Sequence, residues 1–371
     1  MKFRVIVRRL TSYGGAEVIA FRFAKYLHTL GLLEEVVCGR NEIREVAFKV
    51  KEVGFLRPGR FLKTYSFQRR VLSYLKRTSN AVNFTFSKVP NCHVFRDGGG
   101  THCGFLKFSI DAYSFPRNLF KRLSRLFNPI NYYNPLLESR IFLTSRKILA
   151  ISELVKEEIL EYYNFPGLED RIEVIPNPVD KNRFNKEVKE QLRCRGRELV
   201  KAENGDFIVG FASSNFWLKG LHLLIKALVL LPKNIKLVIA GGRSSKRFLQ
   251  LAKKLGVEKR VFFLGKVNNM ELFYSGIDLL AHPSYYDTFG NVITEALAMG
   301  IPVICSNRTG AKDFVKNGVN GFVLSSFSPD EIAEAIYASL GKNWDFTLNL
   351  PSDEEVFREY VRLGEQSLSP V

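Results

Sequence analysis

Short apolar runs alternate with amphipathic segments along most of the first half of the chain. Residues 3–7 form one such run, and apolar side chains then recur at helical spacing from Val18 to Leu27. Further short apolar runs occupy residues 36–38, 81–86, 94–95 and 147–151. This alternation is typical of parallel strands joined by crossover helices. The first half therefore predicts an α/β domain.

The same alternation resumes near Phe207. Further apolar runs occupy residues 208–212, 236–242, 261–265, 278–283, 301–306 and 321–324. They predict a second doubly wound sheet, whose ligands bind at the carboxyl edge of the strands. Residues 176–178, Pro-Asn-Pro, interrupt regular structure between the halves, as a link between domains does. We expect one domain at 1–175, a second at 176–352, and a helical segment at 353–371.

The chain is strongly basic, with a formal net charge of +18. Such a charge implies an anionic partner, which would be nucleic acid, an anionic membrane or a phosphorylated substrate. A solvated surface rich in Lys, Arg and Glu is the alternative. No stretch reaches the roughly 18 unbroken apolar residues that a membrane span needs, and the N-terminal run is not that of a signal peptide. Five scattered cysteines without metal-ligand spacing favour a reducing cytoplasm.

The most informative stretch lies at residues 284–302. It carries two carboxylates, Asp287 and Glu295, on either side of the sequence Phe289-Gly290-Asn291-Val292. A loop that enters a helix offers free backbone N–H groups and the positive end of the helix dipole, which together bind phosphate. Asp287 is placed to accept hydrogen bonds from sugar hydroxyls, and Glu295 to hold a second diol such as a ribose. The stretch therefore predicts a site for a nucleotide sugar.

Two glycine-rich loops follow strands of the first half. Gly14 and Gly15 lie between the first predicted strand and the first predicted helix, where the backbone can approach a phosphate or a sugar. Three glycines at 98–100 allow the same close approach between Asp97 and His102. We expect these two side chains to be the polar groups nearest to a bound sugar. The histidine spacing does not match zinc ligand sets, so no metal site is expected.

Residues 103–127 interleave aromatic and basic side chains and contain one acid, Asp111. A second run, 55–77, has the same character. Such mixtures favour contact with an anionic membrane surface. The side chains expected at that surface are Phe105, Lys107, Phe120, Lys121, Arg122 and Arg125. An amphipathic helix packed in the core is the alternative interpretation of 103–127.

Taken together and in chain order, these motifs resemble the retaining GT-B glycosyltransferases of family 4. The family's donor motif reads Glu, seven residues, Glu, and here Asp287 replaces the first Glu. The glycine loop, the Pro-Asn-Pro hinge and Lys219-Gly220 also match, and residues 96–106 resemble a loop of lipopolysaccharide core glucosyltransferases. The resemblance implies two Rossmann-like domains that face a central cleft. The N-terminal domain would bind the acceptor, the C-terminal domain would bind the nucleotide sugar, and the last helix would return to the first domain.

The resemblance also implies roles for further residues. Lys219 would neutralise the leaving diphosphate, with Ser213 at the start of the same loop. The family often has an arginine where Leu218 or Asn215 stands here, and Arg183 or Arg243 would supply that missing charge. The backbone around Val267 would cup the nucleobase. The catalytic set would be Asp97, His102, Lys219 and Asp287, which orient and stabilise groups rather than attack them.

The implied activity is transfer of a hexose, with retention, from a nucleotide-diphosphate sugar to a lipid-linked saccharide such as the lipopolysaccharide core. UDP-glucose is the expected donor, and no metal or other cofactor is expected. The enzyme would be cytoplasmic and peripheral on the inner leaflet of the plasma membrane. One alternative is a non-enzymatic basic protein that binds nucleic acid, although no nucleic-acid motif supports it. The others are a GT-B sugar epimerase and a glucan synthase with a soluble substrate.

Overall fold

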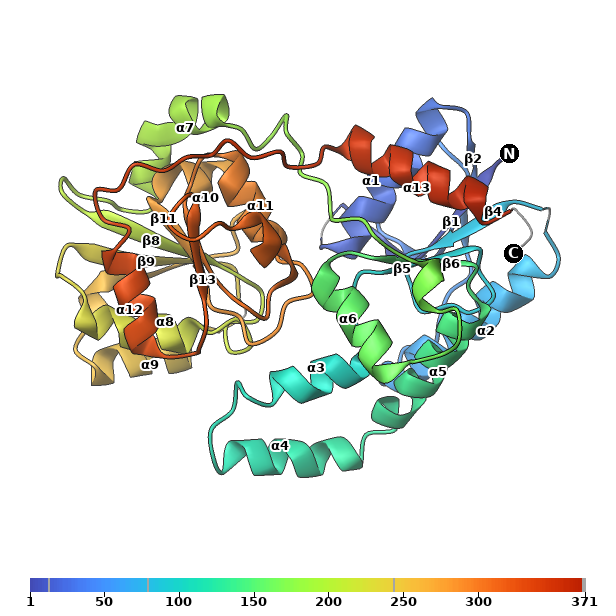
Figure 1. Ribbon diagram of the computed structural model, residues 1–371, viewed down its shortest axis with the longest axis horizontal. Helices are drawn as coiled ribbons and strands as arrows, with labels where there is room; N and C mark the ends of the chain where they lie inside the picture. Colours follow the sequence, from blue (N-terminus) through green and yellow to red (C-terminus); the bar gives the residue numbers. More distant parts are fainter. Residues whose placement is uncertain (13, 79, 243, 369–371) are drawn as a thin grey trace. The chain divides into compact units, whose positions relative to one another are not determined.

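The computed structural model describes residues 1–12, 14–78, 80–242 and 244–368. The chain forms two compact units (Figure 1): the first comprises Met1–Pro178 with Pro351–Val371, and the second comprises Val179–Leu350. Each unit is an α/β structure in which helices cover a parallel sheet. The second unit therefore begins and ends within three residues of the predicted domain limits.

The described part of the first unit contains a seven-stranded parallel sheet in the order β3-β2-β1-β4-β5-β6-β7. Its strands are β1 (Phe3–Leu10), β2 (Leu33–Asn41), β3 (Val50–Glu52), β4 (Val82–Thr85), β5 (Val94–Asp97), β6 (Lys147–Ala150) and β7 (Ile172–Val174). Its helices are α1 (Ala16–Thr29), α2 (Arg60–Leu75), α3 (His102–Ser109), α4 (Arg117–Leu126), α5 (Ile130–Thr144), α6 (Glu153–Tyr162) and α13 (Asp353–Gln366). β1 is central because nearly all of its apolar side chains are buried, and it pairs on one side with β2 and on the other with β4.

The C-terminal helix α13 packs on the first unit, beside α1 (Figure 1). A capping box between Ser352 and Glu355 starts this helix. Its buried Tyr360 packs against Phe84 of the sheet and accepts a hydrogen bond from Arg96 Nε at 3.0 Å. Arg96 is itself buried and also donates to Asn177, so β5, the end of the hinge and α13 share one polar anchor.

The described part of the second unit contains a six-stranded parallel sheet in the order β10-β9-β8-β11-β12-β13. Its strands are β8 (Phe207–Ala212), β9 (Ile235–Ala240), β10 (Val261–Gly265), β11 (Leu279–His282), β12 (Val303–Ser306) and β13 (Gly321–Leu324). Its helices are α7 (Lys186–Leu199), α8 (Leu221–Ala227), α9 (Lys246–Lys254), α10 (Met270–Gly276), α11 (Asn291–Ala298) and α12 (Pro329–Tyr337). The strand order reverses between β8 and β11, so the loops after these two strands diverge and leave room for a ligand at the carboxyl edge.

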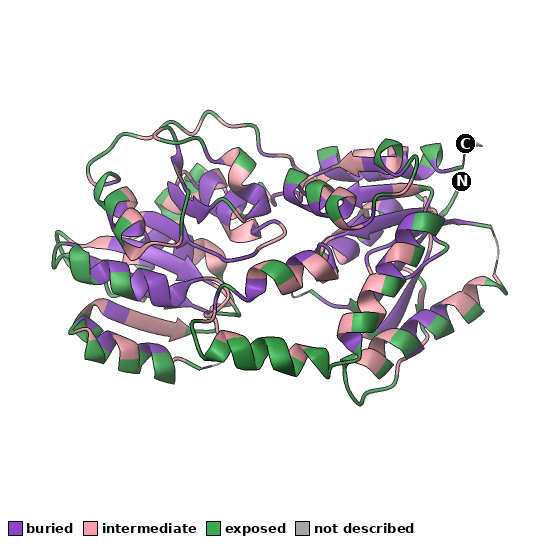
Figure 2. Cartoon of the chain, turned by 60° about the horizontal axis from the view of Figure 1, so that its bottom comes forward, coloured by how far each residue is buried: buried purple, intermediate pink, exposed green. Residues whose placement is uncertain are grey.

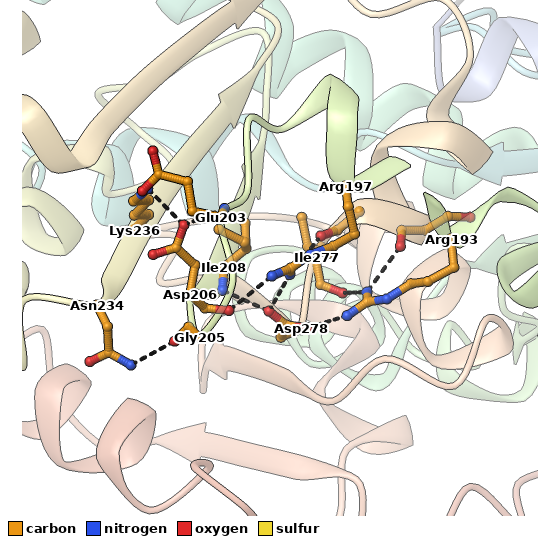
Figure 3. A network of polar contacts seen from close by, with 12 residues as sticks. Arg193, Arg197, Glu203, Gly205, Asp206, Ile208, Asn234, Lys236, Ile277 and Asp278 are labelled. Atoms are coloured by element: carbon orange, nitrogen blue, oxygen red, sulfur yellow. Dashed lines mark hydrogen bonds and ion pairs between the residues drawn. The ribbon is translucent and has the colours of Figure 1, made fainter. Parts of the chain in front are cut away.

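The opposite, amino edge of this sheet is closed by a network of charges (Figure 3). Asp278 accepts hydrogen bonds from Arg193 at 2.5 Å, from Arg197 at 2.7 Å and from the backbone N–H of Ile208 at 2.8 Å. The two arginines belong to α7, which is thereby fixed to the start of β8 and β11. The hydrogen bonds of the Asp278 carboxylate are used within the protein, so this network is structural. The loops that can bind a ligand are those at the carboxyl edge.

Candidate active site

Three side chains from two loops meet at the carboxyl edge of the second sheet. Lys219 lies in the loop between β8 and α8, and its Nζ is 2.7 Å from Oδ2 of Asp287, in the loop between β11 and α11. His282, the last residue of β11, places its Nε2 2.8 Å from the same oxygen. Since a carboxylate only accepts hydrogen bonds, the ring proton of His282 is on Nε2. The structure therefore brings together two predicted residues and adds a histidine that the motif did not reveal.

The protonation states of this cluster follow from burial and charge. Burial of Asp287 opposes its ionisation, but the Lys219 ammonium and the His282 hydrogen bond outweigh it and hold the pKa of Asp287 well below its usual value. Burial lowers the pKa of His282, although the bond to Asp287 acts in the opposite direction. The cluster is therefore a carboxylate, an ammonium and a neutral imidazole at neutral pH.

Lys219 retains hydrogen-bonding capacity in this arrangement. An ammonium has three N–H donors, of which one faces Asp287 and another donates to the backbone carbonyl of Tyr286 at 2.9 Å. Among the described contacts the third has no acceptor, so it is available to an oxygen of a bound diphosphate. Gly220, the next residue, has a φ of 80°, and a Cβ there would lie 2.1 Å from the carbonyl oxygen of Pro283. Only glycine allows the Lys219 loop to approach the end of β11 this closely.

A column of flat side chains joins the two loops behind Lys219 and Asp287. Trp217 stacks on His222 with ring centres 4.5 Å apart, and His222 stacks on Tyr285 at 5.7 Å. Tyr285 stacks in turn on Phe327 at 4.4 Å, and the guanidinium of Arg308 lies over the ring of Phe327. Because aromatic stacking fixes both distance and orientation, this column sets the separation of the Lys219 loop from the Asp287 loop.

The N-terminus of α11 follows directly after Asp287. The helix begins at Asn291, and Gly290 precedes it with a φ of 90°. Phe289 is buried against Phe314, so only its backbone can face a ligand. Asn291 and Val292 are half-buried in the first turn. The first turn thus presents backbone N–H groups beside a lysine, as a phosphate site requires.

Glu295 lies one turn into α11, and its carboxylate is fixed by a hydrogen bond from α10. Tyr274 of α10 is fully buried and donates a hydrogen bond to Glu295 Oε2 at 2.7 Å. Burial, together with the charge of Glu295, raises the pKa of Tyr274 well above its usual value, so the phenol remains a donor. Arg183 pairs with Glu271 through Nε at 2.6 Å, and the negative charge of Glu295 also raises the pKa of Arg183. The predicted Arg183 therefore lies near the predicted Glu295.

The remaining predicted donor residues are spread over neighbouring loops. Ser213 directly follows β8, and its hydroxyl accepts the backbone N–H of Asn215 at 2.9 Å. Val267 is half-buried in the loop after β10. Arg243 lies outside the described residues. Gly14 and Gly15 belong to the first unit, where Gly14 has a φ of 99° and Gly15 caps α1.

A cavity of about 280 Å³ lies at the carboxyl edge of the first sheet, between the two glycine-rich loops. Asp97, at the end of β5, lines it and is 2% exposed. Its Oδ1 accepts the N–H of Gly99 at 3.2 Å, whereas its buried Oδ2 has no hydrogen-bond partner among the described residues. Burial raises the pKa of Asp97 to about 6, against the opposing charge of Lys88. An unpartnered buried acceptor in a cavity needs a hydrogen-bond donor from a ligand or from water.

His102 is held by the protein rather than presented to the cavity. Its Nε2 is 2.9 Å from the amide oxygen of Asn131, and its Nδ1 is 3.2 Å from the amide nitrogen of Asn134. Both ring nitrogens are engaged, and burial lowers the pKa of His102, so the ring is a neutral donor to Asn131. The predicted role of His102 as a ligand-orienting group therefore requires these amides to release it.

The triple-glycine loop is hydrogen-bonded to a buried acid, Glu138, which was not singled out from the sequence. Glu138 of α5 is fully buried and accepts hydrogen bonds from Lys88, from the backbone N–H of His102 at 3.0 Å and from the hydroxyl of Tyr163 at 2.6 Å. Its signal in the sequence was a lone acid that shares a helix face with apolar Ile141 and Phe142. Glu138 fixes the loop that carries Asp97 at one end and His102 at the other.

The residues predicted to face a membrane fall into two groups. Helix α4 has no buried residue and is exposed along most of its length (Figure 2), so its interpretation as a core helix is wrong. Phe120, Lys121 and Arg122 are among its exposed residues. Arg125 instead turns inward and donates to the carbonyl of Leu106 at 2.7 Å and to Ser109, which ties α4 to α3. Lys107 is exposed and pairs with Glu161, and Phe105 is half-buried beside His102. In the part of the chain that the structure describes, no helix is long and apolar enough to cross a membrane.

The two halves of the chain match two glycosyltransferase families. Residues 13–183 match the family described as Glycosyltransferase Family 4, and residues 197–351 match Glycosyl transferases group 1. A glycosyltransferase of Methanocaldococcus jannaschii is 30% identical over 223 residues, which are 58% of this chain and 56% of that protein. The lipopolysaccharide glucosyltransferase WaaG of Escherichia coli K12 is 26% identical over 205 residues, 53% of each chain. The chain thus matches about half the length of these curated relatives.

Solved structures match over nearly the whole chain. The crystal structure of WaaG superposes with a TM-score of 0.78 and 19% identity, and covers 98% of this chain and 94% of WaaG. HepE of Anabaena, in complex with UDP and glucose, superposes with a TM-score of 0.68 and 20% identity, over 99% and 98% of the two chains. These likenesses confirm the predicted α/β architecture of two Rossmann-like units. The chain is therefore a glycosyltransferase of the GT-B fold, whose N-terminal half matches the Family 4 model and whose C-terminal half matches the group 1 model.

Proposed function

We propose that this protein transfers a hexose, with retention of configuration, from a nucleotide-diphosphate sugar to a lipid-linked saccharide. The observation that carries the proposal is the meeting of Lys219 and Asp287 beside the N-terminus of α11, at the point where the strand order of the second sheet reverses. The arrangement suits a ligand that has a diphosphate in the middle and a hydroxyl-rich group at each end.

Each part of the donor has a matching group. The diphosphate would lie against the first turn of α11 and the free N–H of Lys219. The sugar hydroxyls would donate to Asp287, whose low pKa keeps it an acceptor. The ribose diol would bind Glu295, which Tyr274 holds in place. We propose UDP-glucose as the donor, in line with the UDP and glucose named for the HepE crystals.

The reaction requires charge neutralisation more than a nucleophilic side chain. The bond between the anomeric carbon and the diphosphate oxygen breaks, and the acceptor oxygen bonds to the same face of that carbon. The acceptor proton passes to the departing diphosphate. Negative charge grows on the diphosphate as the bond breaks, so Lys219 and the helix N-terminus stabilise the transition state more than the ground state. No metal ion or other cofactor is part of this proposal.

The acceptor would enter the cavity of the first unit. Oδ2 of Asp97 is the buried acceptor there that has no partner among the described residues, and a sugar hydroxyl is a suitable donor. Lys88 and Arg8 line the same cavity and suit an acceptor that carries phosphate or carboxylate groups. We propose that the acceptor is a saccharide of the lipopolysaccharide core type. The name of WaaG, a lipopolysaccharide glucosyltransferase, supports this choice.

Helix α4 would hold the enzyme on an anionic, cytoplasm-facing membrane surface. Phe120 is 67% exposed and Phe127 86% exposed, beside exposed Lys121 and Arg122. Large apolar side chains at this exposure, interleaved with cations, suit the interface of an anionic bilayer. The net charge is then explained without a nucleic-acid partner.

The test is a donor screen that follows release of the nucleotide diphosphate, with and without a lipid-linked saccharide. We expect one sugar nucleotide, UDP-glucose, to support turnover that rises when the acceptor is added. Analysis of the product by NMR then gives the anomeric configuration. If no sugar nucleotide binds the second unit at millimolar concentration, the proposal is wrong. If the nucleotide binds and polynucleotides compete for the same site, the basic nucleic-acid alternative is favoured.

A further inference from the structure

A second hollow, of about 540 Å³, lies between α2 and α5, and the proposed function does not use it. Its lining residues differ from those of the cavity at Asp97. We call it the α2–α5 groove. The hydroxyl of Tyr133 on α5 donates to Gln68 on α2 across it, and Tyr133 also packs edge-on against Phe61 of α2 at 5.1 Å. The groove is therefore a defined feature of two packed helices, and its volume is that of a small-ligand site.

The lining of the groove is both apolar and cationic. Its apolar part comprises Leu72, Leu136 and Leu137, and Leu136 is 71% exposed. Its charges are Arg69, Lys76 and Arg140, and among the described contacts none of the three has a carboxylate partner. Every lining residue that the structure describes is neutral or basic. The groove can therefore offer a ligand an apolar contact at Leu136 and a favourable charge interaction at the neighbouring cations.

The charge is a property of the segment as well as of the groove. Residues 55–77 carry seven Lys and Arg residues and no Asp or Glu. Some of these cations have local roles: Lys63 lies over the ring of Phe55, and Arg70 donates to the carbonyl of Val53. Among the described contacts, Arg69 and Lys76 have no such partner, and both line the groove. Arg57, Arg60 and Arg77 have no such partner either, but they lie outside the groove. Arg69 and Lys76 are therefore the two cations of this segment that can meet a ligand in the groove.

We propose that the α2–α5 groove binds one anionic phospholipid of the membrane. Its phosphate would lie among Arg69, Lys76 and Arg140, because guanidinium and ammonium groups match phosphate oxygens. The first part of an acyl chain would cover half-buried Leu72 and exposed Leu136, which removes apolar surface from water. This site goes beyond the glycosyl transfer proposed above and beyond the diffuse attraction of α4 to a charged surface, since it binds a single lipid in a defined place.

The probe is dihexanoyl phosphatidate, a short-chain lipid that is used below its micelle concentration so that no bilayer is needed. We expect calorimetric titration of the whole protein to give a saturable isotherm with one site. The double variant Arg69→Gln/Arg140→Gln should bind at least tenfold more weakly. Arg57→Gln/Arg77→Gln removes two exposed cations from the same basic segment but none from the groove, and its affinity should change by less than twofold.

Two further ligands identify which part of the lipid is recognised. Dihexanoyl phosphatidylcholine has the same chains without the net negative charge, and inorganic phosphate has the charge without chains. Both should bind at least tenfold more weakly than the phosphatidate. Phosphate that binds as tightly as the phosphatidate, or an equal loss in both double variants, overturns the proposal. A titration that never saturates also overturns it.

Folding and donor binding are measured on the same samples. Both double variants should keep the circular dichroism spectrum of the wild type and its affinity for UDP, because neither pair of positions lies in the second unit. If UDP fails to bind even the wild type while the phosphatidate titrates as expected, the proposed function fails and the lipid site stands. If the variants lose their folded spectrum, Leu136→Ser replaces them, since Leu136 is 71% exposed and its loss costs little packing.

Discussion

Removal of the Lys219 ammonium tests the proposed chemistry most directly. Its Nζ is 2.7 Å from Asp287 Oδ2, and the side chain is only 17% exposed, so solvent screens its charge incompletely. A charge about 4 Å from a phosphate oxygen contributes on the order of 4 kcal/mol at an effective dielectric constant near 20. Loss of a single preorganised electrostatic donor, such as one group of an oxyanion hole, costs about 10²–10³-fold in kcat. We therefore expect Lys219→Ala to lower kcat by about 10²-fold or more.

The same substitution disturbs Asp287, and the assay must separate the two effects. Without Lys219 the bond from His282 is the one described contact that the Asp287 carboxylate keeps, so its pKa rises towards the usual range and the variant is less stable. Kd for UDP measured by calorimetry reports ground-state binding, and kcat measured from UDP release reports the transition state. We expect Kd to rise by less than tenfold while kcat falls by 10²-fold or more, because the charge on the diphosphate grows during bond breaking.

Lys226→Ala is the matched control, since Lys226 is an exposed lysine on the adjacent helix α8. It should leave both kcat and Kd within twofold of the wild type. The reasoning about Lys219 is refuted if Lys219→Ala turns over normally while it remains folded. In that case the positive charge at the diphosphate comes from elsewhere, and Arg183 is the next candidate because it lies near Glu295.

Three further predictions concern other parts of the chain. Tyr274→Phe removes the hydrogen bond to Glu295 and should weaken UDP binding by about 1–2 kcal/mol in calorimetry, with exposed Tyr337→Phe as control; equal affinities would contradict the role given to Glu295. Because the pKa of Asp97 is raised to about 6 from an ordinary 3.8, the folded state holds the proton more tightly. The stability of the wild type relative to Asp97→Asn should then fall by about 2–3 kcal/mol as the pH rises from about 4 to about 6, as urea unfolding measures; parallel pH profiles would argue against it. Lys121→Gln/Arg122→Gln should weaken binding to anionic vesicles by about 2 kcal/mol at low salt, as sedimentation measures. Lys253→Gln/Lys254→Gln on α9 is the control and should not weaken it. Equal binding of the two double variants would exclude α4 as the membrane contact.

The sequence predicted the site best where chemistry and local structure coincide. Asp287 and Glu295 were found because their spacing spans a loop and a helix start, and local rules fix where such a loop lies relative to its strand. Lys219 was singled out only through the resemblance of Lys219-Gly220 to the family's phosphate-binding loop. His282 was passed over, although it lies near the end of the predicted run 278–283 and therefore at the ligand edge. Its importance depends on the direction of one side chain, which spacing does not determine.

The fold was predicted from the same local signals, and its errors have local causes. β3 was missed because Val50–Glu52 has one apolar residue and becomes a strand only by pairing with β2 at the edge of the sheet. Residues 103–127 were treated as one segment, whereas the structure divides them into α3 and α4. Arg125 was grouped with the membrane-facing cations because its charge is visible in the sequence. Its bonds to Leu106 and Ser109 depend on how α4 folds back, and such long-range contacts leave no periodic signal.

The two units differ in how their carboxylates are used, and this difference supports the division of labour proposed here. In the second unit, Asp287 has a paired charge and a depressed pKa, so it is an acceptor at every physiological pH. In the first unit, Asp97 is buried with one oxygen unpartnered in the described structure, and its pKa is raised to about 6. The arrangement at Asp287 suits a permanent hydrogen-bond acceptor for the hydroxyls of the nucleotide sugar. The one at Asp97 leaves an acceptor oxygen to which a hydroxyl-bearing ligand can donate. Binding of an acceptor saccharide should therefore lower the pKa of Asp97 and reduce the cost of its burial.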